Sequence, residues 1–552
     1  MASQPPSKRR SLTRTPTIDP ATAKDASNRA MIQVVPAAWY WDSTLLPKLA
    51  SGHLDGFEEV LGPSRRTCLR GKRTWGSICS GVEGSHFVME ACQEALARWC
   101  TATGQEPLEL CQLFACDTDQ VKRRWIHDVI NARRQAKGMQ PICVFSDVKD
   151  LNSTKAWCDV HRALCMVPDV DILCVSASCK DLTKPSKAKG PLPPSQLQSS
   201  AAGHADTFPS LLAYLDHHHT SVILFENSDN MVDDSQQVSQ ATHDVFQSEL
   251  ASRHFEGQSF LLNAKLFGVP QNRRRHFAVY VACETTIVNF AGRTVFDQFA
   301  TMAELLKICK RTPPLMTELL LPSDHEHVQN CLKDRLATGV ESCFSGTTNS
   351  WVTEHQKEYG KLRIRWGSQP PCHATLNSPW LRTLNLCQRS ALTLHQHRLL
   401  ASSTPLTSAS STDLVQAMAR VPRVPPRLMV DLTPNIARLS TSMRDDSCEV
   451  APCILAKQIL WMHIKEPRPM LGLEAMIFQG LPISRIEVPP WVSEQMLQAL
   501  AGSAVPCPVL LALALSTFVA ISWCDLEVSQ IQENSTEEDL ENALELLAMI
   551  AA

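Results

Sequence analysis

The chain has 552 residues, enough for two or three domains, and 44% of them are hydrophobic, so a large core is available. The net charge of −3 favours no class of partner. The 21 cysteines form no Cys-x-x-Cys pair and no Cys/His series at zinc spacing, and no secretory signal precedes them, which argues against a disulfide scaffold. We therefore expect a reducing compartment and no metal site.

Residues 1–65 have the composition of an N-terminal extension. The first thirty are rich in Pro, Ser, Thr and basic residues, which predicts partial disorder. The cluster Lys8-Arg9-Arg10 could bind nucleic acid or a nuclear import receptor, although a solvated tail is the commoner role of such a run. We expect a nuclear location, and otherwise a cytoplasmic one.

A short strand at residues 74–78 is expected to run into a turn that carries Gly81 and Gly84. Apolar residues at helical spacing follow over residues 87–99. Glycines at such a place let the backbone approach a ligand closely at a helix N-terminus. This is a weak indication of a nucleotide site, because many strand-to-helix turns contain glycine.

Two further predicted strands end in acidic residues. Residues 113–116 lead to Asp117 and then to a helix at 120–135, and residues 142–145 lead to Asp147. An acid after the second strand of a doubly wound sheet can accept hydrogen bonds from ribose hydroxyls. The pattern indicates a Rossmann-like cofactor site, and the alternative is a set of unrelated helix N-caps.

The apolar strand expected at residues 171–176 ends in a small-residue turn that presents Cys179. A basic stretch rich in Pro, Ser and Lys follows at residues 184–200. A thiol at the carboxyl end of a strand, beside a loop, is a reasonable place for a nucleophile, and the alternative is a buried structural cysteine.

After a helix at 207–215, the apolar strand at 221–225 delivers Glu226 to the same sheet edge as Cys179. Gln271, Arg273 and Arg275 then alternate along an extended segment, which places them on one face. Guanidinium groups there could hold phosphates or order a catalytic loop.

The pattern becomes irregular over residues 286–465, where we expect a separate recognition region. Order returns over residues 466–524. This segment includes an uncharged stretch that we predict to be a buried helix starting near Pro508 and not a membrane span. Residues 525–552 predict an acidic C-terminal helix, with a capping box at Ser535 and Glu538.

Taken together, these motifs resemble the cytosine-C5 DNA methyltransferase family. The order matches over residues 74–285 and 466–520: a glycine-bearing first turn, a cysteine loop, Glu226-Asn227, the Gln-x-Arg-x-Arg segment, a variable region, and a final Gly-Ser-Ala-Val-Pro. The nucleophile motif differs from the family's Pro-Cys-Gln, because here it is Ser178-Cys179-Lys180. That form resembles a divergent subgroup seen in unicellular algae.

Three more residues depart from the family pattern: Glu83 in the turn stands at a glycine position, Asp117 at a Glu position and Ser503 at an Asn position. The resemblance implies an α/β fold, with a Rossmann-like methyltransferase sheet covered by helices on both faces and a smaller, irregular target-recognition domain. The catalytic, cofactor-binding domain would cover residues 66–285 and 466–524.

The resemblance also implies the chemistry, which is transfer of a methyl group from S-adenosylmethionine to carbon 5 of a cytosine flipped out of duplex DNA. Cys179 would add to C6, Glu226 would hold N3, and Arg273 and Arg275 would stabilise the thiolate loop and the base. The residues implied to hold the cofactor are Gly81, Gly84, Asp117, Asp147, Ser503 and Val505.

Two alternatives stay open. One is an RNA cytosine-C5 methyltransferase, and the other is a catalytically silent nucleic-acid-binding homologue, which the Ser178 and Lys180 departures would favour. We expect no membrane partner, and the sequence leaves the oligomeric state, the target site and the preference for maintenance or de novo methylation open.

Overall fold

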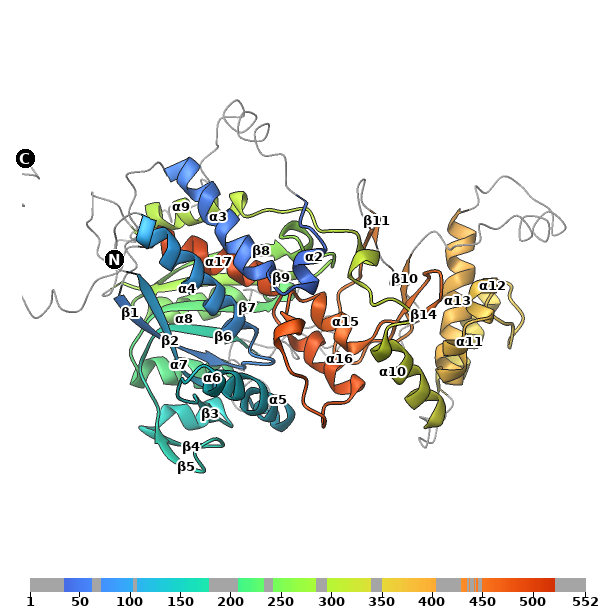
Figure 1. Cartoon of the computed structure of the whole chain (residues 1–552), viewed down its shortest axis with the longest axis horizontal. Helices are drawn as coiled ribbons and strands as arrows, with labels where there is room; N and C mark the ends of the chain where they lie inside the picture. The colour runs from blue at the N-terminus through green and yellow to red at the C-terminus, as the bar shows by residue number, and fades with distance from the viewer. Residues whose placement is uncertain are drawn as a thin grey trace, which may run out of the picture. The chain divides into compact units, whose positions relative to one another are not determined.

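The computed structural model describes residues 34–61, 71–102, 107–177, 207–232, 242–283, 295–338, 350–403, 428–433, 436, 441, 443–444 and 449–521. A nine-stranded mixed sheet lies at its centre, in the order β5-β4-β3-β2-β1-β6-β7-β9-β8 (Figure 1). The strands are β1 Gly71–Ile78, β2 Leu108–Cys116, β3 Cys143–Phe145, β4 Lys155–Cys158, β5 Ala163–Met166, β6 Val170–Ser176, β7 Thr220–Ser228, β8 Phe255–Asn263 and β9 Arg274–Ala282.

The middle of the sheet is parallel, and its strand order reverses between β1 and β6. In doubly wound sheets a ligand binds at such a switch point, beyond the carboxyl ends of the strands. Ile78 of β1 pairs with Val175 of β6, and Ser176 pairs with Glu226 of β7. The register therefore brings the ends of β1, β6 and β7 to one edge, as the sequence predicted.

Helices cover both faces, which confirms the predicted fold class. Alternating residues of β6 divide the core, because Ile172 and Cys174 pack into one cluster and Leu173 and Val175 into the other. The helices are α2 Ala38–Trp41, α3 Leu45–Leu61, α4 Gly84–Ala102, α5 Gln120–Trp125, a π-helical turn at Ile126–Asn131, α6 Ala132–Ala136, α7 Thr207–His217, α8 Thr242–Ala251, α9 Val295–Ile308 and α17 Cys507–Ala520. The helices α3, α4, α9 and α17 share the first face, and α7 and α8 the second.

The uncharged stretch near Pro508 is a core helix. Residues Glu494–Ala520 are long and apolar enough to cross a membrane by composition, but 89% of the apolar window is buried inside the chain. The segment is also divided into α16, Glu494–Ser503, and α17, which packs against α3, α4 and α9. Because other helices and the sheet surround α17, its apolar residues are distributed around the whole helix and are not confined to one face.

Two helices outside the predicted catalytic boundaries pack into the main core. Leu46, Leu49 and Phe57 of α3, which precedes the predicted boundary at residue 66, belong to this core. Phe299 and Leu305 of α9, which follows the predicted boundary at residue 285, pack into it as well, and the domain boundaries stay predictions. The first 33 residues, residues 62–70 and the predicted C-terminal helix lie outside the described residues.

The region after α9 has its own small core and a three-stranded sheet, β10-β13-β14. Val430 and Trp461 of that sheet are fully buried against Leu392. Its main elements are α10 Glu326–Ala337, α11 Ser350–Lys361, α12 His373–Leu376, α13 Leu386–Ser403, β10 Met429–Asp431, a two-stranded ladder of β11 Met443–Arg444 and β12 Glu449–Val450, β13 Leu460–Met462, β14 Arg468–Pro469 and α15 Gly472–Ile477. The smaller predicted domain is therefore more ordered than its composition suggests.

A buried ion pair joins β14 to α15. Arg468 donates from Nη1 to Glu474 Oε2 at 2.8 Å and from Nη2 to Glu474 Oε1 at 2.6 Å, and neither side chain is exposed. The same carboxylate accepts from the backbone N–H groups of Leu321 and Leu471, both at 2.8 Å. Every contact is bidentate or charge-assisted, so this pair connects three segments of the chain rigidly.

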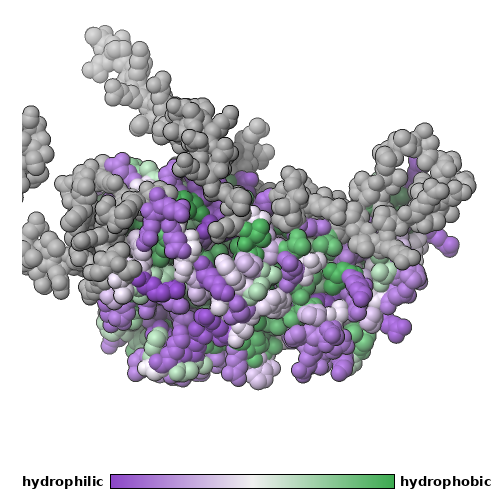
Figure 2. Space-filling model, turned by 45° about the horizontal axis from the view of Figure 1, so that its top comes forward, coloured by the Kyte–Doolittle hydropathy of each residue, from purple (hydrophilic) through white to green (hydrophobic). Residues whose placement is uncertain are grey.

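The surface in Figure 2 is mostly hydrophilic, with hydrophobic residues that reach it in separate clusters. Among the described residues, three large exposed apolar side chains belong to the β4–β5 hairpin: Trp157 is 48%, Leu164 65% and Met166 56% exposed. This hairpin therefore contributes little apolar burial to its own stability.

Candidate active site

The start of the predicted cysteine loop is held beside Glu226. Ser176 and Glu226 are paired residues of neighbouring parallel strands. Asn227, which is 1% exposed, donates from Nδ2 to the carbonyl of Ala177 at 3.3 Å. The chain is described as far as Ala177, so Cys179 and the basic stretch 184–200 lie outside the described residues. The loop thus leaves the sheet at the position that the sequence predicted.

Glu226 carries a carboxyl group in a poorly solvated position. Burial raises its pKa, while the positive charges of Arg275 and Arg273 work against that rise. Arg275 is the nearer of the two, with Nε 3.5 Å from Glu226 Oε1. A carboxyl group with a raised pKa can retain a proton or hold one in a hydrogen bond, as the predicted contact with N3 of cytosine requires.

Arg273 donates several hydrogen bonds to backbone carbonyls. Its guanidinium donates to the carbonyls of Ile454 at 2.9 Å, Gly502 at 3.3 Å and Ala504 at 2.9 Å. It is 4% exposed. These bonds fasten the Gly502–Val505 segment to the start of β9, and the predicted contact of Arg273 with the thiolate loop and the base stays a prediction.

Gln271 also connects the start of β9 to distant segments of the chain. Its Nε2 donates to the carbonyl of Phe478 at 3.0 Å, and its Oε1 accepts from the N–H of Ile454 at 3.1 Å. Gln271 is fully buried. Neither this role nor that of Asn227 was predicted. A sequence signal for both roles exists, because Gln271 and Asn227 each have an amide side chain near apolar residues. Once buried, such a side chain must form hydrogen bonds, often with the backbone.

The glycine turn leads directly into α4. Gly81 has φ +60°, in the left-handed region, and a Cβ there would lie 3.6 Å from the carbonyl oxygen of Ser503. A Cβ on Gly84 would lie 3.1 Å from Cys507 Sγ. Both glycines therefore allow the turn to approach the segment that precedes α17, as the predicted cofactor site requires.

The turn contains one unusual residue, Glu83. It is fully buried with φ 58°, and its carboxyl group accepts from the hydroxyls of Ser77 at 2.7 Å and Ser85 at 2.5 Å. Burial raises the pKa of Glu83. The departure from glycine is thus accommodated by two serine partners and not left as an unpaired charge.

Asp117 accepts three hydrogen bonds at the end of β2. The donors are the N–H of Gly81 at 2.9 Å, the N–H of Asp119 at 2.9 Å and Lys122 Nζ at 3.4 Å. A carboxylate has about four acceptor sites, and the described residues fill three of those of Asp117, whose contact with a ribose hydroxyl stays a prediction. Asp117 therefore also links the end of β2 to the glycine turn.

Asp147 is the N-cap of the short helix Val148–Asn152, where its side chain accepts from Lys149 N–H at 3.0 Å. Asp119 likewise caps α5. The local hydrogen bonds of Asp147 are thus those of a helix N-cap, which was the alternative to a cofactor site. The cofactor role of Asp147 stays a prediction.

A small cavity brings several predicted residues together. Glu226, Gly84, Ser503 and Val505 line it, along with the ends of β1 and β6 up to Ser176. Its volume is about 20 Å³, so it must widen to admit a nucleoside cofactor. The donor set nevertheless fits S-adenosylmethionine: a helix N-terminus behind a glycine turn, an acid after β2, and a carbonyl-rich segment held by Arg273.

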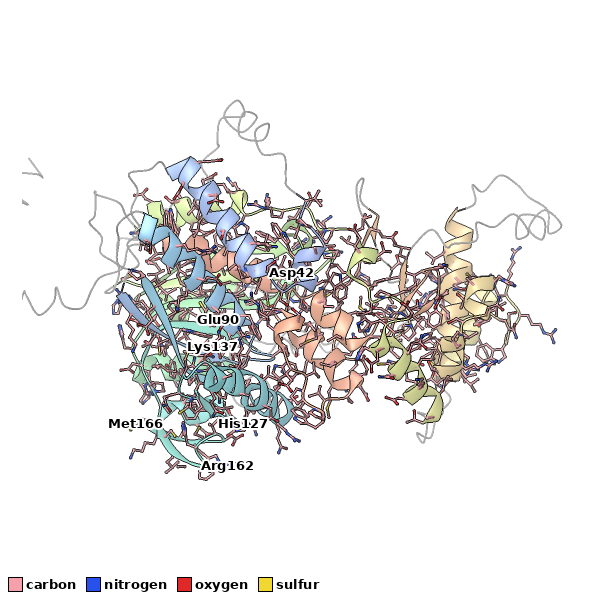
Figure 3. The ribbon with its side chains drawn as sticks, viewed as in Figure 1. Asp42, Glu90, His127, Lys137, Arg162 and Met166 are labelled. Carbon is pink, nitrogen blue, oxygen red and sulfur yellow. The ribbon has the colours of Figure 1, made fainter. Side chains whose placement is uncertain are left out.

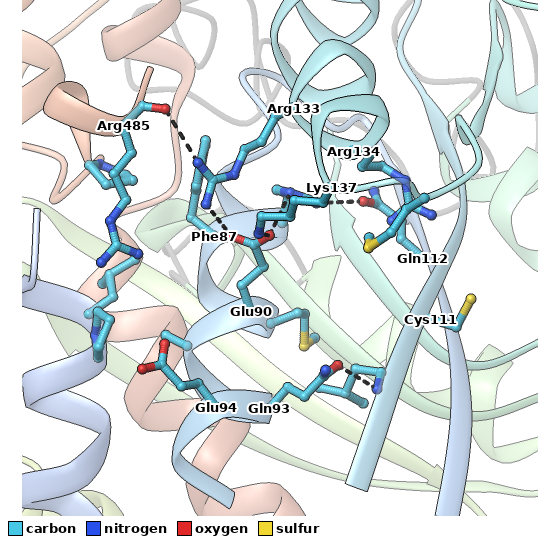
Figure 4. Close-up of a pocket in the computed structure, with 18 of the residues that line it drawn as sticks. Phe87, Glu90, Gln93, Glu94, Cys111, Gln112, Arg133, Arg134, Lys137 and Arg485 are labelled. Carbon is cyan, nitrogen blue, oxygen red and sulfur yellow. Dashed lines mark hydrogen bonds and ion pairs between the residues drawn. The ribbon is translucent and has the colours of Figure 1, made fainter. Parts of the chain in front are cut away.

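A larger cavity, of about 490 Å³, lies between α3, α4, α6 and β2 and contains none of the predicted residues (Figure 4). Its centre is Glu90, which accepts from Arg133 Nη2 at 2.9 Å and from Lys137. Burial alone would raise the pKa of Glu90, but hydrogen bonds and charges from His86, Lys137 and Arg133 outweigh it and lower that pKa. Arg133 and Lys137 already neutralise the Glu90 carboxylate at the centre of this cavity, so we assign it no ligand.

Residues 140–518 match the profile of the C-5 cytosine-specific DNA methylase family. The chain is 21% identical over 437 residues to the DNA (cytosine-5-)-methyltransferase DMT5 of Cryptococcus neoformans, which covers 79% of this chain and 16% of the relative. It therefore spans about a sixth of that relative's length.

Solved structures with similarity to the chain include a Spodoptera frugiperda DNMT2 mutant and the S. pombe Dnmt2 methyltransferase. The Spodoptera frugiperda protein is 13% identical with a TM-score of 0.36, and the S. pombe protein is 12% identical with a TM-score of 0.37. Each alignment covers 81% of this chain and 98–99% of the other. A putative DNA modification methyltransferase from an E. coli prophage is 14% identical, with a TM-score of 0.38 and coverage of 81% and 98%.

Proposed function

Because the chain belongs to the C-5 cytosine-specific DNA methylase family, we propose that it transfers a methyl group from S-adenosylmethionine, the cofactor of that family, to carbon 5 of cytosine in DNA. The observation that carries the proposal is the alignment of Ser176 with Glu226 at the switch point of the sheet. The cavity between them also reaches Gly84, Ser503 and Val505. A nucleophile three residues after Ser176 would start from this edge.

Cys179 is the proposed nucleophile. Its thiolate adds to C6 of cytosine, which forms a carbon–sulfur bond and moves the electron pair of the C5–C6 double bond toward C5. Glu226 donates to N3 and so stabilises the charge that develops there. A bound S-adenosylmethionine would supply the methyl group as an electrophilic carbon and would leave as S-adenosylhomocysteine. Transfer of the C5 proton to a base or to water then releases the Cys179 thiolate and restores the C5–C6 double bond.

Glu226 suits this role because its pKa is raised by burial. Arg275 lies against the same carboxyl group and limits that rise. The pair therefore supplies a proton-holding group beside a fixed positive charge, which would also attract the developing negative charge of the base.

The substrate base is proposed to be a cytosine flipped out of a DNA duplex. A base within the stack cannot reach the end of a strand, so extrusion is needed. The Ser178-Cys179-Lys180 form is proposed as an active variant, with Lys180 and the basic stretch 184–200 available to phosphates. The Lys8-Arg9-Arg10 cluster supports a nuclear location.

Covalent trapping tests the proposal. Duplex DNA that contains 5-fluorocytosine, incubated with the chain and S-adenosylmethionine, should yield an adduct that survives denaturing gels, because a fluorine at C5 cannot be removed as a proton. The matched variant Cys179→Ala should give no adduct while it still binds the cofactor.

Two results would overturn this function. An adduct that persists in Cys179→Ala would assign the chemistry to another residue. DNA binding without any adduct in the wild-type chain would support the catalytically silent alternative. The same probe placed in RNA tests the RNA alternative, which predicts trapping on RNA in preference to DNA.

A further inference from the structure

Three cysteines and one histidine converge at the outer edge of the sheet. Cys143 begins β3, Cys158 ends β4, Cys165 lies in β5, and His161 lies in the turn between β4 and β5. The four potential ligand atoms all lie within 4.8 Å of one another. Figure 3 places Arg162 and Met166, which belong to the same hairpin, at the periphery of the molecule.

The strand register puts the three sulfurs on one face. Phe145 of β3 pairs with Cys158, so Cys143, two residues earlier, shares the face of Cys158. Cys158 pairs with Ala163, so Cys165, two residues later in β5, shares that face as well. The turn then brings His161 back over them, with Arg162 in the left-handed region at φ 53°. Secondary structure alone therefore assembles the cluster.

The contacts exceed what hydrogen bonding can satisfy. His161 Nδ1 lies 3.5 Å from Cys143 Sγ, 3.3 Å from Cys158 Sγ and 3.4 Å from Cys165 Sγ. One ring nitrogen either donates one proton or offers one lone pair, so it cannot bond three thiols at once. A tetrahedral zinc ion, with Zn–S near 2.3 Å and Zn–N near 2.0–2.1 Å, separates such ligands by about 3.6 Å.

We propose that Cys143, Cys158, His161 and Cys165 bind a structural zinc ion. Four protein ligands would leave no open coordination position, which is the mark of a structural and not a catalytic site. The N–H of Val144 donates to Cys158 Sγ at 3.4 Å, as the backbone does toward ligating thiolates. On binding, the thiols release their protons to solvent, and the metal holds the thiolates.

The ion has a clear structural task. One residue pair, Phe145 with Cys158, and a hydrogen bond from the Asp159 N–H to the Val144 carbonyl at 2.9 Å join the β4–β5 hairpin to β3. The exposed Trp157 and Leu164 provide little burial. A two-stranded hairpin with so small a core is marginal by itself. The metal would fix the hairpin to the sheet.

The same turn reaches toward the predicted cofactor site. Asp159 accepts from Arg123 Nε at 2.7 Å, and Arg123 Nη1 donates to the carbonyl of Asp117 at 2.9 Å. The side chains of Asp159 and Arg123 thus link the turn between β4 and β5 to the backbone of Asp117, the acid that follows β2. The site itself is independent of the proposed methyl transfer.

The sequence contains a ligand spacing typical of zinc sites, and the zinc proposal departs from the expectation of no metal site. Cys158 and His161 are separated by two residues, and His161 and Cys165 by three, which is ligand spacing for zinc. A pattern restricted to Cys-x-x-Cys pairs misses it, because the second ligand is histidine and Cys143 arrives from another strand.

A second group of three possible ligands, His327, Cys331 and Glu494, supplies the control. Glu494 Oε1 is 2.5 Å from His327 Nε2, and Glu494 Oε2 accepts from Gly472 N–H at 2.5 Å. Its carboxylate is therefore occupied by an ion pair and a helix cap. We expect no zinc there, so Cys331→Ser should leave the metal content unchanged.

Metal content of the full chain, purified without added zinc or a metal-affinity tag, tests the site. We expect about one zinc per chain by elemental mass spectrometry, and its loss in Cys158→Ser/Cys165→Ser. Zinc that leaves with Cys331→Ser, or that persists in the double variant, would overturn the proposal.

A second measurement avoids variants that fail to fold. In the wild-type chain, a chelator should raise the alkylation rates of Cys143, Cys158 and Cys165 by about tenfold or more, while Cys372 serves as an unaffected thiol. Replacement of zinc by Co²⁺ should give thiolate-to-metal charge-transfer absorption. Equal alkylation with and without chelator, or a disulfide among the three cysteines, would overturn the proposal.

Discussion

Two Arg–Glu pairs occupy different regions of this molecule and have different environments. At the junction of β14 and α15, Arg468 and Glu474 are fully buried, meet through two bonds of 2.8 and 2.6 Å, and have additional backbone partners. At the edge of the central sheet, Arg275 approaches Glu226 through one contact of 3.5 Å beside a cavity.

The difference shows how the same residue types can serve the fold or the chemistry. Glu474 has its acceptor sites filled, so it holds three segments together and has no capacity for a ligand. Glu226 is buried enough for its pKa to rise but retains capacity beside the cavity. The two pairs therefore differ in how many acceptor sites of the carboxylate are filled by the described residues.

The largest expected effect breaks the junction pair. Glu474→Gln places an amide N–H₂ group against donors from Arg468 and Leu471, so one buried charge loses its partner. We expect a loss of about 3–5 kcal/mol in the free energy of unfolding. Chemical denaturation followed by circular dichroism measures this change. A loss below about 1 kcal/mol would mean that the pair is not the fixed junction that its bonds indicate.

The same substitution at Glu226, in the other pair, should reduce activity and leave stability intact. Glu226→Gln removes the acid that holds N3, so we expect methyl transfer to fall by about 10²–10⁴-fold while cofactor binding persists. Stability should not fall, because the neutral amide avoids the cost of a buried carboxylate.

The sign of the pH dependence follows from the raised pKa. A carboxyl group whose pKa is higher in the folded state stabilises the fold at low pH, and that contribution is lost as pH rises through the folded pKa. The melting temperature of Glu226→Gln should therefore rise relative to wild type as pH increases. Unchanged turnover, or a melting difference that moves in the other direction, would remove Glu226 from its proposed role.

A smaller effect is expected at the segment that Arg273 joins to the catalytic edge. A Cβ on Gly502 would lie 2.0 Å from Ala456 N and 2.4 Å from Ala456 Cα, which is backbone that cannot move freely. Gly502→Ala should therefore displace Ser503 and cost about 1–3 kcal/mol. Cofactor affinity, measured by calorimetry, should weaken with it.

The matched control is Gly360→Ala in α11, where a Cβ would meet nothing within 4 Å. There the alanine should be neutral or should stabilise the chain by about 0.5–1 kcal/mol. Equal effects at the two glycines would show that the tight approach at Gly502 does not matter for the site.

The sequence predicts the centre of the sheet well, because its strands are short apolar runs with an acid or glycine at the end. Residues 221–225 and Glu226 are the clearest case. The edge strands were not predicted. In β4 and β5 the alternation is obscured, because Trp157 and Leu164 face solvent and the inward residues are alanine and cysteine. In β8 most residues are partly buried, so no face stands out.

The site divides in the same way. Glu226 could be found because a single carboxylate at the end of an apolar strand has few structural uses. The role of Arg273 could not, because its partners are backbone carbonyls of Ile454, Gly502 and Ala504, which are 181 to 231 residues away. Every residue has a backbone carbonyl, so the sequence does not indicate which carbonyls accept these bonds, and only the folded structure does.

The meeting of Gly84 with the segment before α17 has a consequence for biosynthesis. One wall of the proposed methyl-donor chamber emerges from the ribosome some four hundred residues after the other, since Gly84 packs against Cys507. A nascent or prematurely terminated polypeptide that stops short of Val505 has a half-built chamber, so the proposed ability to modify nucleic acid should switch on only after this segment has been translated.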